Sequence, residues 1–287
     1  MHRLALAFLA ALAVALAVVS LSAAAHRQSR TARPHRIISL SPTMTEDLFA
    51  IGAGKQVIAV DNQSNYPRRA PRTSLSGFTP NVEAIANYHP DLVLISYNPS
   101  GFAAQLRSLG IKVVNIAAAE NLKQAYREIA QLGRLTGHTT GATAVVHSMK
   151  TRLAAIVRSV PASRRHLRVY HELDPTYYTA TSNTFIGSIY KLFGFKDIAD
   201  GADTSSSGGY PQLSGEYIVQ QNPQIIVLAD TKCCQQTLAT VAARPGWNTI
   251  AAVKHGRVVG IDDDVASRWG PRIVQFARAV ARMARKG

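Results

Sequence analysis

From position 36 onward, short runs of β-branched and aliphatic residues alternate with stretches whose apolar residues recur at helical spacing. The runs are short enough for strands and lie between turn-forming residues. The predicted strands cover residues 36–40, 57–60, 92–96, 113–116, 167–172, 225–229 and 257–261. The clearest amphipathic helices between them are predicted at residues 43–51, 103–109 and 122–133. This alternation predicts an α/β fold with mainly parallel sheets.

The chain contains an internal repeat that its spacing makes visible. Residues 81–83 begin a short predicted helix that ends at residues 89–90, and residues 214–216 begin another that ends at residues 222–223. The spacing from Glu83 to Pro90 equals that from Glu216 to Pro223, and a strand-like run follows each helix. A weaker echo pairs residues 48–53 with residues 190–195, and in each a glycine suited to a left-handed cap stops the helix. We therefore expect two Rossmann-like lobes of related design.

A long helix is predicted between the two copies of the repeat. Residues 139–160 contain no proline and one glycine, carry apolar residues at helical spacing, and are followed by Pro161. A helix of about 20 residues spans about 30 Å, enough to bridge two small domains. The alternative is an ordinary helix packed inside one domain. The expected organisation is an N-terminal segment (1–25), a linker (26–35), an N-terminal lobe (36–138), a bridging helix (139–161) and a C-terminal lobe (162–287).

The N-terminal segment has the pattern of an export signal. Residues 4–25 are uncharged and largely apolar, follow Arg3, and end in three alanines that suit signal peptidase. A retained membrane anchor is the alternative, because about 20 apolar residues can span a bilayer. Either interpretation predicts an exported protein, located in the periplasm or at the outer face of the cytoplasmic membrane.

Composition and charge narrow the function classes. The chain is 47% hydrophobic, which supports a packed core. Its formal net charge of +15 suits nucleic acid or an anionic membrane surface, but the basic residues are scattered rather than gathered in blocks between exposed aromatics, which disfavours nucleic acid. The two cysteines, Cys233 and Cys234, are adjacent and make a poor zinc motif. A disulfide between them and two free thiols both remain open.

Three motifs together resemble a known family, the exported solute-binding proteins of importers for cobalamin, ferric siderophores and haem. They are residues 36–42 with Thr45 and Glu46, the two glutamate-to-proline repeats, and residues 269–272. Residues 210–214 and 264–268 are most similar to the cobalamin-binding branch. The resemblance implies a cobalamin or related corrinoid held between two α/β lobes and delivered to the permease of an ABC importer. It also implies a monomer without a resident cofactor, and ferric-siderophore or haem binding is the alternative within the family.

The same resemblance assigns candidate site residues. Aromatic rings are expected around the ligand at Tyr66, Phe78, Tyr97, Tyr178 and Tyr210. Asp264 and Arg268 are expected to bind polar groups of the ligand, and a helical ion pair four residues apart is the alternative. For the aromatics the alternative is core packing. Glu83 and Glu216 are expected to dock onto arginines of the permease, although a carboxylate in the first helical turn is also stabilising by itself.

A catalytic or metal-handling α/β protein is the main rival class. The sequence contains no G-x-S-x-G, H-E-x-x-H or Walker motif, which disfavours an enzyme that hydrolyses esters, peptides or nucleotides. Polar groups at residues 171–174 and 262–264 could hold a metal ion only if ligands converged from both lobes, and the nine histidines are dispersed. We therefore predict a binding protein that is not an enzyme and has no metal site.

Overall fold

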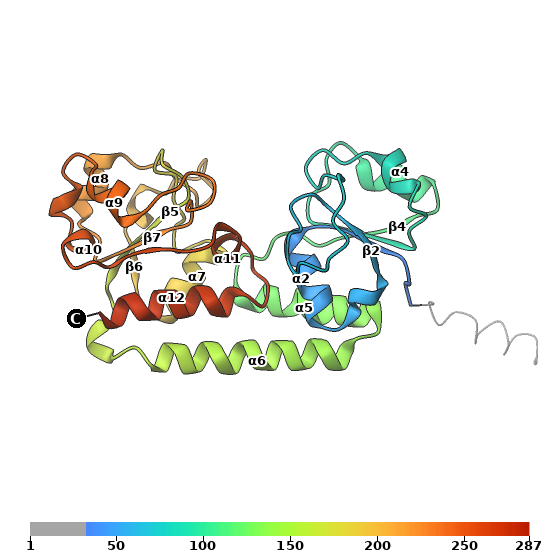
Figure 1. The fold of residues 1–287 in the computed structure, drawn as a ribbon, viewed down its shortest axis with the longest axis horizontal. Helices are drawn as coiled ribbons and strands as arrows, with labels where there is room; N and C mark the ends of the chain where they lie inside the picture. The colour runs from blue at the N-terminus through green and yellow to red at the C-terminus, as the bar shows by residue number, and fades with distance from the viewer. Residues whose placement is uncertain (1–32, 287) are drawn as a thin grey trace, which may run out of the picture. The chain divides into compact units, whose positions relative to one another are not determined.

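The computed structural model describes residues 33–286, and two parallel four-stranded sheets form its framework (Figure 1). The first sheet has the order β2-β1-β3-β4. Its strands are β1 (Ile37–Leu40), β2 (Val57–Val60), β3 (Leu92–Ile95) and β4 (Lys112–Asn115). The predicted signal segment and most of the predicted linker lie outside the described residues.

The second sheet repeats the topology of the first, with the order β6-β5-β7-β8. Its strands are β5 (Arg168–Glu172), β6 (Lys196–Asp197), β7 (Ile225–Leu228) and β8 (Val258–Gly260). Every pairing between these strands in both sheets is parallel, so the predicted α/β class with two related lobes is confirmed. β6 was not predicted, because two residues are too few to show a period.

Eleven α-helices flank the sheets within residues 33–286. In the N-terminal lobe they are α2 (Pro42–Ala50), α3 (Val82–Ala86), α4 (Phe102–Ser108) and α5 (Leu122–Thr136). After α6 (Thr139–Arg158) follow α7 (Phe185–Leu192), α8 (Gly215–Gln221), α9 (Leu238–Ala242), α10 (Ala251–Lys254), α11 (Asp263–Ser267) and α12 (Ile273–Arg285). All residues of β1, β3 and β7 are buried, as expected when helices cover both faces of a parallel sheet.

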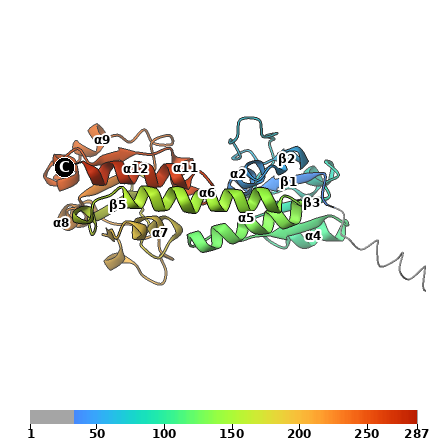
Figure 2. The same ribbon diagram turned by 90° about the horizontal axis from the view of Figure 1, so that it is seen from below.

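The 20 residues of α6 form the long helix that the sequence predicts, and α6 lies beside α5 and α12 (Figure 2). One hydrophobic core extends through this region, since Met44, Met149 and Val169 belong to the same buried cluster. Residues from His35 onward form one compact unit. None of the helices within residues 33–286 has both the length and the hydrophobicity to cross a bilayer.

The internal repeat extends further than its sequence shows. The Arg36 guanidinium donates to the carbonyls of Tyr88 (2.7 Å) and His89 (2.9 Å) at the end of α3. Arg168 makes the equivalent bonds at the end of α8, to the carbonyls of Gln221 (2.9 Å) and Asn222 (3.0 Å). His89 and Asn222 are both left-handed, with φ of 48° and 47°. Each lobe therefore ties the end of its short helix to the first strand in the same way.

Candidate functional site

The five predicted ligand-binding aromatics are all exposed. Phe78 is 74% exposed, Tyr97 54%, Tyr66 45%, and Tyr178 and Tyr210 43% each. In the described part of the chain only three other large hydrophobic side chains are comparably exposed: Leu109, Leu192 and Leu238. Core packing, the alternative explanation for these rings, therefore does not describe any of the five.

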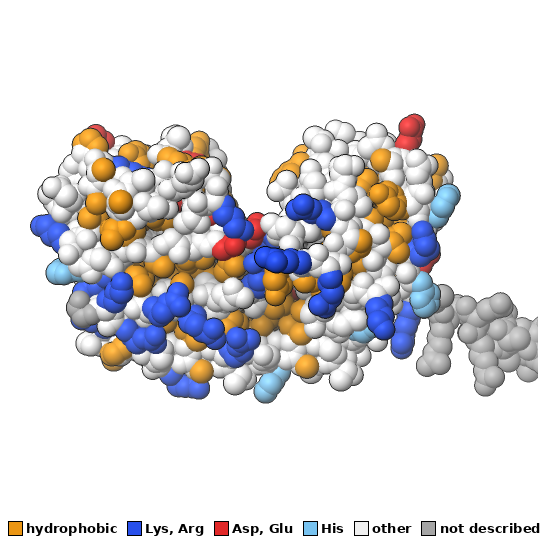
Figure 3. Space-filling model, viewed as in Figure 1, with side chains coloured by type: hydrophobic (Ala, Val, Ile, Leu, Met, Phe, Trp, Pro, Cys, Tyr) orange, Lys and Arg blue, Asp and Glu red, His pale blue; other side chains and the backbone are white. Residues whose placement is uncertain are grey.

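All five rings lie in segments that follow the carboxyl ends of strands. Tyr66 and Phe78 follow β2, Tyr97 follows β3, Tyr178 follows β5, and Tyr210 follows β6. In open parallel α/β sheets this is the edge at which ligands bind. The space-filling view shows a hollow between the two lobes with basic and acidic side chains on its floor (Figure 3). The sequence signal for these rings was the resemblance to the family, which places aromatic residues at these positions.

The Phe78 loop is held close to β1. A Cβ atom on the preceding Gly77 would lie 2.6 Å from the carbonyl oxygen of Leu40, so only glycine allows this approach. The Ser76 hydroxyl accepts hydrogen bonds from the backbone N–H of Phe78 (3.2 Å) and of Thr79 (3.0 Å). The exposed ring therefore stands on a fixed turn.

The segments that carry Tyr178 and Tyr210 are joined to each other. The Thr179 N–H donates to the Pro211 carbonyl (3.1 Å), and the Leu213 N–H donates to the Tyr177 carbonyl (3.1 Å). Between these bonds, Tyr178 pairs with Gln212 in an antiparallel bridge. The two rings of the C-terminal lobe are therefore presented by one braced structure.

Arg268 lies in a polar network on the floor between the lobes. It is 8% exposed, and its guanidinium donates to Asp264 Oδ1 (2.7 Å) and Glu46 Oε1 (2.9 Å). Two further bonds reach the Gln63 carbonyl (2.9 Å) and Asn65 Oδ1 (3.0 Å). The structure thus contains the ion pair between Asp264 and Arg268, and the other three hydrogen bonds of Arg268 reach the opposite lobe.

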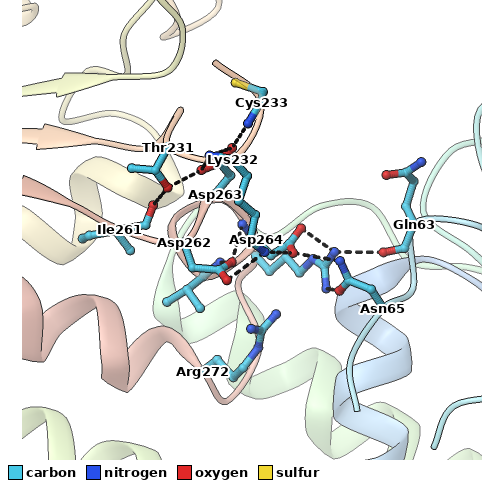
Figure 4. A network of polar contacts seen from close by, with 12 residues as sticks. Gln63, Asn65, Thr231, Lys232, Cys233, Ile261, Asp262, Asp263, Asp264 and Arg272 are labelled. Atoms are coloured by element: carbon cyan, nitrogen blue, oxygen red, sulfur yellow. Dashed lines mark hydrogen bonds and ion pairs between the residues drawn. The ribbon is translucent and has the colours of Figure 1, made fainter. Parts of the chain in front are cut away.

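Asp264 is shared between the two lobes (Figure 4). It accepts from Lys232 Nζ (2.8 Å) and from Asn65 Nδ2 (2.9 Å) in addition to Arg268. Burial raises the pKa of Asp264, but the hydrogen bonds from Lys232 and Asn65 together with the Arg268 charge hold it below its ordinary value. The carboxylate is therefore ionised, and its exposed part faces the hollow with negative charge.

The neighbouring acidic residues bind protein groups. Asp263 accepts from the backbone N–H groups of Lys232 and Cys233, each at 3.0 Å, and Asp262 caps α11 through the N–H of Asp264 (3.0 Å). Among the described residues, no group of three His, Cys, Asp or Glu side chains is placed to hold a metal ion. Cys233 and Cys234 are joined by a disulfide bond, which decides the alternative that the sequence left open.

Glu46 and Arg272 are site residues to which sequence analysis gave no role. Glu46 is 3% exposed and accepts from Arg272 Nε (2.8 Å) and Nη2 (2.6 Å) as well as from Arg268. We call Glu46, Arg268 and Arg272 the clamp. The Arg272 guanidinium also lies 4.4 Å from the centre of the Tyr66 ring, a cation–π contact that fixes this aromatic. The sequence feature that could have singled out Glu46 and Arg272 is their place in the first and last of the motifs that resemble the family.

Glu83 and Glu216 occupy the same position in α3 and α8, the second residue of each helix. The helices begin with equivalent caps, Asn81 Oδ1 accepting from the Ala84 N–H (2.8 Å) and Ser214 Oγ from the Tyr217 N–H (3.1 Å). Both glutamates are exposed. Neither forms an ion pair with another residue of the described chain. Each lobe thus presents one solvated carboxylate at a helix start.

Comparison with known proteins identifies the class. The family model described as "Periplasmic binding protein" matches residues 37–265, and the chain belongs to this family. A cobalamin-binding protein of Halobacterium salinarum is 34% identical over 259 residues, covering 88% of this chain and 69% of the relative.

Solved structures show the same fold. A possible iron-binding, periplasmic solute-binding protein of Staphylococcus epidermidis has a TM-score of 0.74 and 28% identity, over 88% of this chain and all of that one (100%). A periplasmic haem-binding protein of Vibrio cholerae has a TM-score of 0.76 and 23% identity, over 86% of this chain and 97% of that one. The protein is therefore a substrate-binding protein of the periplasmic family, with small-ligand binding proteins as its relatives.

Proposed function

We propose that this protein binds a corrinoid, cobalamin, in the hollow between its lobes and delivers it to an ABC importer. The observation that carries the proposal is the set of five exposed aromatic rings at the carboxyl edges of both sheets. Exposed rings cost free energy unless a ligand covers them, and a large, partly apolar macrocycle offers each of them a surface. The relative that is 34% identical bears the name cobalamin-binding protein.

The polar floor gives the ligand its orientation. The ionised Asp264 and the Lys232 ammonium, whose side chain is 50% exposed, lie 2.8 Å apart and offer an acceptor and a donor to the amide side arms of a corrin. Arg268 belongs to the clamp and binds Glu46 on the protein side, so its role is to hold Asp264 in place. Tyr66 stacks on Arg272, and its ring lines a pocket together with Phe49.

Glu83 and Glu216 dock the loaded protein onto the importer. Two exposed carboxylates in equivalent positions suit arginines on a permease, and complementary charge sets both the rate of approach and the register of the complex. The protein acts outside the cytoplasmic membrane, as a monomer, and carries its ligand without chemical change.

Calorimetric titration of the protein with cyanocobalamin, haem and a ferric hydroxamate siderophore, side by side, tests the ligand. We expect saturable one-to-one binding of cyanocobalamin and a rise in melting temperature through linkage. If the protein binds haem or the siderophore but not cyanocobalamin, the proposal of a corrinoid ligand is wrong and the compound that binds takes its place. A response that a chelator abolishes would indicate a metal ion, and turnover of any of the compounds would indicate an enzyme.

A ferric complex is the second candidate ligand. The Staphylococcus epidermidis structure, at 28% identity, is described as a possible iron-binding protein. A siderophore complex or haem also presents a broad surface that aromatic rings can cover.

A further inference from the structure

We infer that the groove between α5 and α6 is a second binding site, for the headgroup of an anionic phospholipid at a membrane surface. The groove has a volume of about 690 Å³ and is lined by residues of α5 and α6. Its rim is basic: Lys123, Arg127, Arg134, His147 and Lys150.

The floor of the groove is less polar than its rim. Tyr126, Ala130, Ala142 and Val146 line it between the basic side chains. The Lys150 ammonium lies 5.1 Å from the centre of the Tyr126 ring, so one rim cation is held over an aromatic floor residue. An apolar floor beside a cationic rim fits a phosphate group joined to a glycerol and acyl chain better than it fits a fully hydrated anion.

The positive charge of the rim is not neutralised within the protein. Lys123, Arg127, Arg134 and Lys150 are all exposed, and in residues 33–286 none of the four takes part in an ion pair. Lys123 and Arg127 stand four residues apart on one helix, a spacing at which like charges repel. A bound anion would remove this repulsion.

The surrounding helices extend the same charge. α5, α6 and α12 contain one acidic residue, Glu128, which is buried and accepts a hydrogen bond from Trp269 Nε1 (2.6 Å). Further exposed cations on α6 and α12 are Arg152, Arg158, Arg278, Arg282 and Arg285. Figure 3 shows Lys and Arg side chains gathered along the side of the molecule where α6 and α12 lie. Such a face is attracted to anionic lipid, and each basic residue near the surface adds to the attraction.

Vesicle co-sedimentation of the full chain tests the site. The apolar run at residues 4–25 is common to all variants, so the comparison is between neutral phosphatidylcholine vesicles and vesicles with about 30 mol% phosphatidylglycerol. We expect at least about tenfold tighter binding to the anionic vesicles, and loss of this preference between about 50 and about 500 mM NaCl. Equal binding to both compositions would overturn the proposal.

Charge-matched variants locate the site. The groove variant reverses Lys123, Arg127, Arg134 and Lys150 to Glu, and the control variant reverses Lys112, Lys191, Lys196 and Lys254, which are exposed elsewhere. The groove variant should lose the preference for anionic vesicles at least about tenfold while the control keeps most of it. An equal loss of the preference for anionic vesicles in both variants would mean that net charge alone determines binding. That result would overturn the proposal that the groove is the binding site.

Two further measurements guard the interpretation. Replacing the four groove residues by Gln keeps the helices free of new charge and should give the same loss, so misfolding of the Glu variant would not hide the result. Thr143→Trp narrows the groove without changing its charge and should weaken binding about threefold or more. Tighter binding to a single-stranded oligonucleotide than to anionic vesicles would replace the lipid by a nucleic acid.

Discussion

Arg272 donates two hydrogen bonds to the buried carboxylate of Glu46, although 226 positions separate the two residues in the chain. Arg268 binds the same carboxylate, so one buried acid serves two arginines. A buried charge is stable only with its partners, so the three residues of the clamp hold the lobes together as a unit. Removal of any one of them leaves a buried charge without its partner.

Glu46→Gln should destabilise the protein by about 3 kcal/mol or more, since it leaves two largely buried guanidinium groups without their shared carboxylate. Chemical denaturation measures the free energy of unfolding. Glu120→Gln, at an exposed position, is the control and should change stability by less than about 0.5 kcal/mol. Similar changes in the free energy of unfolding for the two substitutions would show that the clamp does not stabilise the fold more than an exposed residue does.

Stability should fall as the pH rises through the titration of Glu128. Burial raises its pKa from 4.5 to about 7, with the Trp269 hydrogen bond acting in the opposite direction. The folded protein therefore keeps a proton that the unfolded chain releases between these values, and stability decreases across that window by up to about 3 kcal/mol. Above about pH 7 this contribution is constant.

Glu128→Gln should flatten that dependence, because an amide does not titrate and can still accept from Trp269. The pKa of Asp47 is raised chiefly by burial and then by the charges of Glu128 and Glu46. Asp47 should therefore contribute less to the pH dependence of stability when residue 128 is a neutral amide. Denaturation of both proteins at several pH values between about 5 and 8 gives the difference curve. Parallel curves of unfolding free energy against pH for the variant and the wild type would show that Glu128 does not cause this pH dependence. Asp197 and His171 titrate alike in both proteins and cancel in the difference.

Tyr210→Ala should weaken ligand binding by about 1 to 2 kcal/mol if the ring covers the ligand. Leu192→Ala is the control, because Leu192 is 37% exposed but lies on α7 rather than in a loop at the sheet edge. Titration calorimetry measures both. An unchanged affinity for the Tyr210 variant would remove this ring from the site.

Reversing Glu83 and Glu216 to Lys should reduce ligand uptake at least about tenfold in a reconstituted importer while leaving ligand affinity unchanged. Each single reversal should have a smaller effect, since the two carboxylates belong to separate lobes. Glu120→Lys provides the control for charge. A loss of ligand affinity in the double variant would show that the docking assignment is wrong.

The sequence predicted the elements well where a period could be read. β2 has the predicted bounds and α6 ends within two residues of them, because long or fully apolar segments carry a clear pattern. β6 escaped because its two residues form a strand only by pairing with β5. The matching roles of Arg36 and Arg168 were also invisible, since a cap on another element leaves no local spacing.

For the site, the family resemblance indicated the aromatic rings, and the structure places all five in segments that follow the carboxyl ends of parallel strands. It did not indicate the clamp, in which Glu46 meets Arg268 and Arg272 only after both lobes have packed. A charge pair between distant segments has no signature in either segment alone. The same limit applies to the groove, whose cations come from two separate helices.

The clamp makes the stability of the N-terminal lobe depend on the end of the chain. Glu46 stands 222 positions before Arg268, so an N-terminal lobe without the C-terminal segment has a buried carboxylate without its counter-charges. A chain interrupted before that point leaves this acid uncompensated, which lowers the stability of the half already formed.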